Sequence, residues 1–231
     1  MKNVDIKKIG IGIGLILIYL LVIPNIALII FELLKLDVKN DSIYILLNIT
    51  IYVLTMIMIV FIYKKDLKKE ALIMKKNLKQ NLKIGFKYWI LAFIFMIISN
   101  MIIIGINGGI ATNEEQNRSL INTFPIFSSI FMIIVGPFIE EILFRKGFKD
   151  AFKNPITYAL FSGLLFGSAH LISSFTSQTN PNLTQLLFII PYSGIGYFFA
   201  RAYSKTNTIY TSTLFHIIHN AIAVGLSILG G

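Results

Sequence analysis

Seven apolar stretches of about 20 residues each occupy most of the 231-residue sequence. As a helix, a stretch of about 20 residues crosses the roughly 30 Å hydrocarbon core of a bilayer. Only 14% of the residues are charged, whereas a soluble domain typically has about 25%. We therefore predict an all-α, polytopic, multi-pass protein of the cell membrane, with one transmembrane domain over residues 1–231 and about seven transmembrane helices. The stretches are 9–31, 43–63, 88–106, 124–144, 156–175, 183–200 and 209–229.

Basic residues are distributed unevenly between the two sides of this predicted domain. With a cytoplasmic N-terminus, 18 of the 21 Lys and Arg residues lie on the cytoplasmic side, and nine of them are lysines from Lys64 to Lys87. Connections rich in Lys and Arg tend to remain in the cytoplasm. The sequence therefore predicts an N-terminus inside and a C-terminus outside. The net charge of +10 then reflects topology and contact with the lipid bilayer, and no nucleic-acid partner is expected.

The residue types available for chemistry are limited. The chain has no cysteine, which excludes disulfides, a thiolate nucleophile and Cys-ligated zinc. Ionisable side chains at bilayer depth are costly, and they usually face a cavity, a partner or a substrate path. The apolar stretches contain few such groups, and all three histidines of the chain are among them. The polar residues are Glu140, Glu141 and Arg145 in the fourth stretch or at its end, His170 in the fifth, and His216, His219 and Asn220 in the seventh.

The spacing of these residues predicts that several of them meet at one depth. Asn154-Pro155 is a turn signal, and both Glu140 and His170 are 15 residues from Pro155. On antiparallel helices they would both lie about 20 Å from the turn. His216 and Asn220 are one helical turn apart and lie roughly 12 to 18 Å from the same side. We expect the four residues to form one site.

The two adjacent glutamates point about 100° apart on a helix, so we expect them to have different roles. Glu141 and Arg145 are spaced i, i+4 in the favourable order, and we predict a structural ion pair. Glu140 is then expected to face His170, because a buried carboxylate beside an imidazole can hold and deprotonate a water. A polar cavity is expected to open to the cytoplasm. His219 either lines this cavity or hydrogen-bonds a neighbouring helix, and we favour the second.

Three short motifs carry a resemblance to a known family. Residues 140–145 resemble the E-E-x-x-x-R motif, residues 166–170 the F-x-x-x-H motif, and residues 216–220 the H-x-x-x-N motif of the CPBP family. That family, also called Abi, groups type II CAAX prenyl endopeptidases with bacteriocin-processing intramembrane proteases. The resemblance covers Phe124 to Leu229, and we delimit the catalytic core as 124–231. One departure is Lys146, where the family often has glycine.

The resemblance implies an intramembrane endopeptidase with a glutamate-activated water. It assigns Glu140 and His170 to the water, and His216 and Asn220 to the oxyanion. The implied substrate is a peptide or a membrane-associated protein. Abundant Ile, Lys and Asn indicate an AT-rich bacterial genome, and prenylated CAAX proteins are not expected in such a source. We therefore expect bacteriocin or signal-peptide processing.

Alternatives remain open at this point. Glu140, His170 and His216 could also form a zinc site with an open position, but the resemblance favours a metal-free mechanism, so no cofactor is expected. A non-enzymatic bacteriocin immunity protein is the main alternative function. A proton-coupled carrier is disfavoured, because the buried ionisable groups form one cluster and matching broken helices are absent from the sequence pattern.

Overall fold

The computed structural model describes residues 4–172 and 183–229, and within these ranges the chain is helical, with one isolated bridge between Val4 and Phe152 and no strand. The predicted all-α, polytopic membrane fold is confirmed. The long helices follow the apolar stretches of the sequence. They are α1 (Ile6–Leu17), η1 (Ile18–Val22) and α2 (Ile23–Leu33), which are continuous; α3 (Asp41–Lys76); α4 (Leu78–Asn107); α9 (Pro155–His170); η4 (Leu183–Phe188) with α11 (Ile189–Thr206); and α12 (Ile209–Leu229).

Six helices in the described ranges are long and apolar enough to cross a membrane. The predicted fifth stretch, 156–175, forms α9, which has 16 residues and is therefore only about 24 Å long. Residues 173–175 of this stretch lie outside the described residues. The number of seven spans and the inside position of the N-terminus remain predictions.

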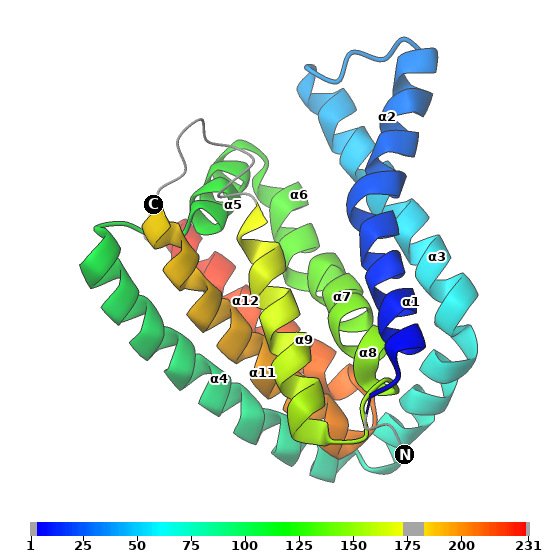
Figure 1. Ribbon diagram of the computed structural model, residues 1–231. Helices are drawn as coiled ribbons and strands as arrows, with labels where there is room; N and C mark the ends of the chain where they lie inside the picture. The colour runs from blue at the N-terminus through cyan, green and yellow to red at the C-terminus, as the bar shows by residue number, and fades with distance from the viewer. Residues whose placement is uncertain (1–3, 173–182, 230–231) are drawn as a thin grey trace.

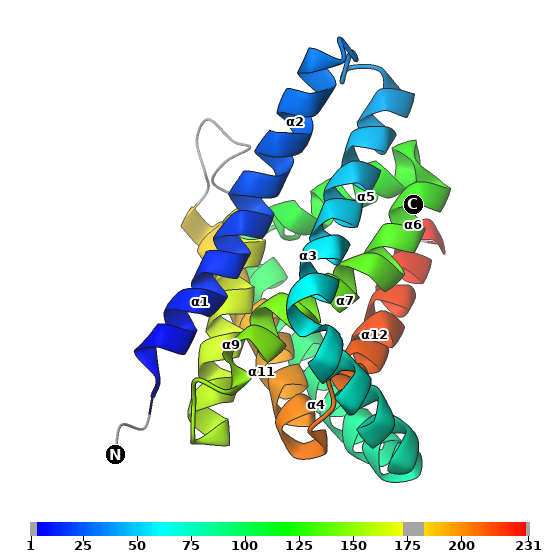
Figure 2. The same cartoon turned by 90° about the vertical axis from the view of Figure 1, so that its right-hand side faces the viewer.

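The helical bundle has two ends that differ in character (Figures 1 and 2). At one end, which we call the basic end, the lysine-rich junction of α3 and α4 lies beside the turns that precede α9 and α12. The start of α1 is also held there, because the backbone N–H of Asp5 donates to the carbonyl of Ala151 at 2.8 Å. At the other end, which we call the α5 end, the polar helix α5 (Thr112–Thr123) lies near the end of α12.

Helices α9 and α11 pack closely because glycines face each other between them. A Cβ atom on Gly163 would lie 2.6 Å from the carbonyl oxygen of Ser193, and one on Gly196 would lie 2.8 Å from the Cα of Gly163. Small residues allow helix backbones to approach in this way inside a membrane. At the basic end, α9 begins where predicted, since the side chain of Asn154 accepts from the backbone N–H of Ile156 at 2.7 Å. The close packing of the glycines holds α9, and with it His170, against α11.

The fourth predicted stretch is helical but irregular. It contains two wide π-helical turns, in which the backbone bonds i to i−5, and these turns are frequent at functional sites. The last of its helical segments ends at Lys149. The segments are α6 (Pro125–Ile130), the π-turn η2 (Phe131–Val135), α7 (Gly136–Glu140), the π-turn η3 (Glu141–Lys146) and α8 (Gly147–Lys149).

Candidate active site

The structure brings the four predicted site residues to one cavity of about 490 Å³. Glu140 comes from the end of α7, His170 from the end of α9, and His216 and Asn220 from α12. Three segments that are distant in the sequence therefore meet at one level of the bundle. This convergence agrees with the depth expected from the spacing to Pro155.

His216 lies between the two adjacent glutamates. Its Nε2 is 3.6 Å from Oε2 of Glu140, and its Nδ1 is 3.0 Å from Oε1 of Glu141. The expectation that Glu140 faces His170 without another partner is therefore corrected. The two carboxylates diverge around the helix, but an imidazole has a nitrogen on each side of its ring and can contact both. The Glu141–His216 contact was missed, because adjacent residue numbers do not reveal which helix crosses in front of them.

Glu140 is the more accessible of the two glutamates. Its side chain is 26% exposed, and that of Glu141 is 0% exposed. Only Glu140 lines the cavity. A carboxylate that is partly open to a cavity can accept a water molecule, whereas a fully enclosed one cannot.

The predicted ion pair between Glu141 and Arg145 is present. Nε of Arg145 is 3.3 Å from Oε1 of Glu141, and both side chains are 0% exposed. The guanidinium carbon also lies 4.1 Å from the ring centre of Phe166, in a cation–π arrangement. Both partners lie on the π-turn η3. The pair is therefore enclosed within the bundle, on the helical segment that directly follows Glu140.

His170 is held in one orientation by its own helix and by α11. Its Nδ1 lies 2.9 Å from the carbonyl oxygen of Phe166. A carbonyl can only accept, so Nδ1 carries the hydrogen and Nε2 of the neutral ring keeps its lone pair. The ring stacks on Tyr192 with a centroid distance of 4.6 Å. His170 can thus act as a hydrogen-bond acceptor in the cavity.

Asn220 is oriented by a backbone carbonyl that a proline leaves free. In the π-turn η2, the N–H of Gly136 donates to the carbonyl of Phe131, five residues earlier. In the same pattern, the donor to the carbonyl of Met132 would be residue 137, but this residue is a proline and has no N–H. The carbonyl of Met132 instead accepts from Nδ2 of Asn220 at 2.8 Å. One amide hydrogen of Asn220 is used in this contact, and the second remains for another acceptor.

His219 lines the same cavity as the predicted site residues. Its ring meets Phe93 and Phe199 edge-on at centroid distances of 6.0 and 6.4 Å. Its Nδ1 is buried and has no hydrogen-bond partner among the described residues. His219 therefore does line the cavity, which was the less favoured of the two expectations, and a hydrogen bond from its Nε2 to a neighbouring helix stays a prediction.

A buried carboxylate that sequence reasoning missed closes the basic end of the bundle. Oε1 of Glu70 accepts from Nζ of Lys146 at 2.6 Å and from Oη of Tyr203 at 2.9 Å. Its Oε2 accepts from the backbone N–H of Ile209 at 2.7 Å. Glu70 therefore joins α3 to η3, α11 and the first residue of α12. The sequence feature that could have indicated this contact is Lys146, which stands where the resembled family often has glycine. It places a second cation directly after Arg145 at membrane depth, and such a cation usually has a partner of opposite charge.

The cavity extends toward the α5 end, so the expectation that it opens on the lysine-rich side is wrong. Its lining includes Asn113, Glu114, Asn117 and Arg118 of α5. The described lining includes no residue of the α3–α4 junction or of the turns before α9 and α12. The physical reason is the dense packing at the basic end, where the Glu70 contacts join four helical segments.

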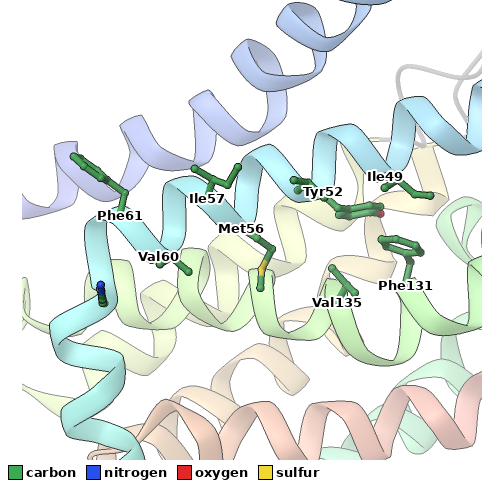
Figure 3. A pocket seen from close by; sticks show the side chains of 10 residues that line it. Ile49, Tyr52, Met56, Ile57, Val60, Phe61, Phe131 and Val135 are labelled. Carbon is green, nitrogen blue, oxygen red and sulfur yellow. The ribbon is translucent and has the colours of Figure 1, made fainter.

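A second cavity, of about 700 Å³, lies along α3 and η2 (Figure 3). Its walls are almost wholly apolar, and Ile57 and Phe61 on α3 are 60% and 89% exposed. Tyr52 and Phe131 line both cavities. Their rings stack at a centroid distance of 4.5 Å. This aromatic pair therefore forms a shared wall between the cavity that contains Glu140 and the outer surface of α3.

The described residues include no group of three or more His, Asp or Glu side chains that could hold a metal ion. The trio considered for zinc, Glu140, His170 and His216, does line one cavity, and Nε2 of His170 keeps its lone pair, but the three side chains do not come together as a group that could hold a metal ion. The part of the chain described here thus does not present the trio as a ready ligand set. The metal-free mechanism remains a prediction.

Comparisons with known proteins match the same region. Residues 122–222 match the family described as type II CAAX prenyl endopeptidase Rce1-like. The chain is 24% identical over 204 residues to the membrane-embedded CAAX protease MroQ of Staphylococcus aureus (strain USA300), covering 84% of this chain and 77% of that protein. It is 25% identical over 121 residues to YdiL of Bacillus subtilis (strain 168), which is named as a membrane peptidase, covering 50% and 44% of the two chains. No solved structure gives a significant match.

Proposed function

We propose that this chain, which belongs to the CPBP family of membrane proteases, is an intramembrane endopeptidase that uses a water activated by Glu140. The observation that carries the proposal is the single cavity that contains Glu140, His170, His216 and Asn220. A partly open carboxylate, two imidazoles and a carboxamide inside one membrane-embedded cavity are the groups that peptide hydrolysis requires. No soluble domain is needed for this chemistry.

In the proposed reaction, Glu140 removes a proton from a water whose oxygen attacks the scissile carbonyl carbon. His170 accepts a hydrogen bond from this water through Nε2 and so helps to orient it. The attack forms a tetrahedral intermediate with a negatively charged oxygen. Glu140 then transfers the proton to the leaving nitrogen as the carbon–nitrogen bond breaks. Water is consumed, and a new carboxylate and a new amine are formed.

His216 and Asn220 are proposed to stabilise the oxyanion. The free amide hydrogen of Asn220 can donate to it, while the contact with Met132 holds the carboxamide in place. His216 lies between two carboxylates, and a ring N–H of this residue can donate a hydrogen bond to the developing oxyanion. Fixed donors of this kind are often the largest single contribution to catalysis. No metal ion takes part in this proposal.

The proposed substrate is a short segment of a peptide or of a membrane-associated protein. Within the family, we favour processing of bacteriocin leaders or secreted signal peptides. This preference rests on the composition of the chain, which is rich in Ile, Lys and Asn and so indicates a bacterial source in which prenylated proteins are not expected.

The test compares the wild-type protein with Glu140→Gln in reconstituted vesicles. The probe is a mixed library of internally quenched peptides with apolar centres and polar flanks, and peptidomics of cells with the same two proteins identifies natural products. We expect Glu140→Gln to abolish cleavage, because it removes the base and leaves the shape unchanged. Glu115→Gln is the matched control, since Glu115 is exposed on α5 and does not line the cavity. Cleavage by Glu140→Gln at the wild-type rate would refute the glutamate mechanism.

A further inference from the structure

The catalytic cavity extends from Glu140 and His216 in one direction only. Toward the α5 end its lining comes from α5, from the second half of α12 and from Asn100 and Ile104 of α4. Several of these lining residues are exposed, including Arg118, whose side chain is 48% exposed. The cavity is therefore in contact with the surroundings at this end.

The opposite direction is closed by large, fully buried side chains. Arg145, Phe148 and Ile209 are each 0% exposed, and Tyr203 is 2% exposed. The Glu70 carboxylate joins this layer through Tyr203 and the backbone of Ile209. A peptide could reach Glu140 from the basic end only by breaking these buried contacts.

The character of the cavity wall changes along its length. The lining residues of α5 include carboxamide and charged groups, whereas α4, η4, α11 and α12 contribute apolar side chains, which we call the apolar section. An extended peptide can form hydrogen bonds with carboxamides, because each of them both donates and accepts. The apolar section is lined by Phe93, Met96, Phe188, Ile195, Ile222 and Val224.

Helix α5 is attached to the bundle at the mouth of the cavity. The backbone N–H of Thr112 donates to Oε1 of Gln185 at 3.1 Å, and Nδ2 of Asn113 donates to Oη of Tyr192 at 3.4 Å. Tyr192 is the residue that stacks on His170. The position of α5 is thus linked to the catalytic residues by one intervening side chain.

We propose that a peptide substrate enters the catalytic cavity as an extended chain from the α5 end. Its apolar side chains occupy the apolar section, and its polar flank contacts the inward face of α5, at Asn113 and Asn117. The cavity of about 490 Å³ is within the range that holds ligands of drug size, so it admits a short stretch of chain and no folded domain. Glu114 and Arg118 neutralise each other in an ion pair of 3.0 Å, so the mouth does not require a charged substrate. This proposal rests on the endopeptidase function proposed above.

The experiment blocks the two ends of the bundle separately. Because the chain has no cysteine, each single-cysteine variant takes one bulky maleimide label. Asn117→Cys places the label at the mouth. Ser119→Cys is the matched control on the same helix, since Ser119 is exposed and does not line the cavity. Lys205→Cys places a label on an exposed residue at the basic end.

Each labelled protein is compared with the same variant before labelling, using the quenched peptide library. We expect the label at position 117 to remove most of the cleavage activity, and the labels at 119 and 205 to leave it unchanged. Unchanged cleavage after labelling at 117 would overturn the proposal, and so would equal inhibition at 117 and 119 or inhibition at 205. If the wild type releases no more fluorescence than vesicles without protein, the endopeptidase function itself fails, which is a distinguishable result.

Discussion

Replacing Glu141 by glutamine removes the charge that faces both Arg145 and His216 inside the bundle. Oε1 of Glu141 is 3.3 Å from Nε of Arg145 and 3.0 Å from Nδ1 of His216. The glutamate and arginine side chains are both 0% exposed. The variant would therefore leave a buried guanidinium without its counter-charge. Breaking a buried pair by removing one partner costs about 3–5 kcal/mol.

Such a loss is large compared with the stability of a typical domain, which is about 5–15 kcal/mol. We expect Glu141→Gln to unfold at a clearly lower temperature in detergent micelles, as followed by the fluorescence of Trp89, the only tryptophan. Adding Arg145→Met removes the uncompensated charge and should restore part of the lost stability. The double variant should stay impaired in cleavage, because the negative charge beside Nδ1 of His216 is removed.

A matched control exists on the surface of the same molecule. Glu114 and Arg118 have the same i, i+4 spacing and a contact of 3.0 Å, but their side chains are 34% and 48% exposed. Glu114→Gln should lower stability by no more than about 1 kcal/mol, since exposed ion pairs contribute little. A Glu141→Gln protein that unfolds at the wild-type temperature would refute the reasoning. A double variant less stable than Glu141→Gln would also refute it.

Other variants test the remaining parts of the site and the topology. His170→Ala should abolish cleavage without changing membrane insertion, measured by peptide release and by membrane extraction, because it removes an acceptor for the water without adding charge. Glu70→Gln should lower the unfolding free energy by about 3–5 kcal/mol, because it removes the carboxylate charge closest to the buried Lys146. Asp66 is exposed and lies 3.6 Å from Lys146, so Asp66→Asn should lower the unfolding free energy by no more than about 1 kcal/mol. With the N-terminus inside, Asn117→Cys should react with a membrane-impermeant thiol reagent on intact cells, and reaction only after the inner face is exposed would reverse the predicted orientation. Purified protein should keep its cleavage activity in a strong chelator, and loss of activity that added zinc restores would contradict the metal-free mechanism.

Periodicity and spacing along single helices were enough to predict part of this protein. The apolar stretches predicted the long helices because the bilayer sets a minimum length for each span. The ion pair of Glu141 and Arg145 was predictable because both residues lie on one helical segment, where neighbours are set by sequence distance. The equal depth of Glu140 and His170 followed from their equal distance to Pro155.

Rotation and crossing of helices decided the rest, since these depend on packing between segments far apart in the sequence. The position of α12 places His216 between Glu140 and Glu141, and no spacing within one segment encodes that contact. The direction of the cavity depends on which end of the bundle packs densely. Glu70 closes the basic end only because α3, η3, α11 and α12 meet around it, and the lysines that surround Glu70 in the sequence do not indicate that its carboxylate is buried. Local periodicity therefore determined the elements and their depths, while the tertiary structure determined which side chains meet and toward which end of the bundle the cavity extends.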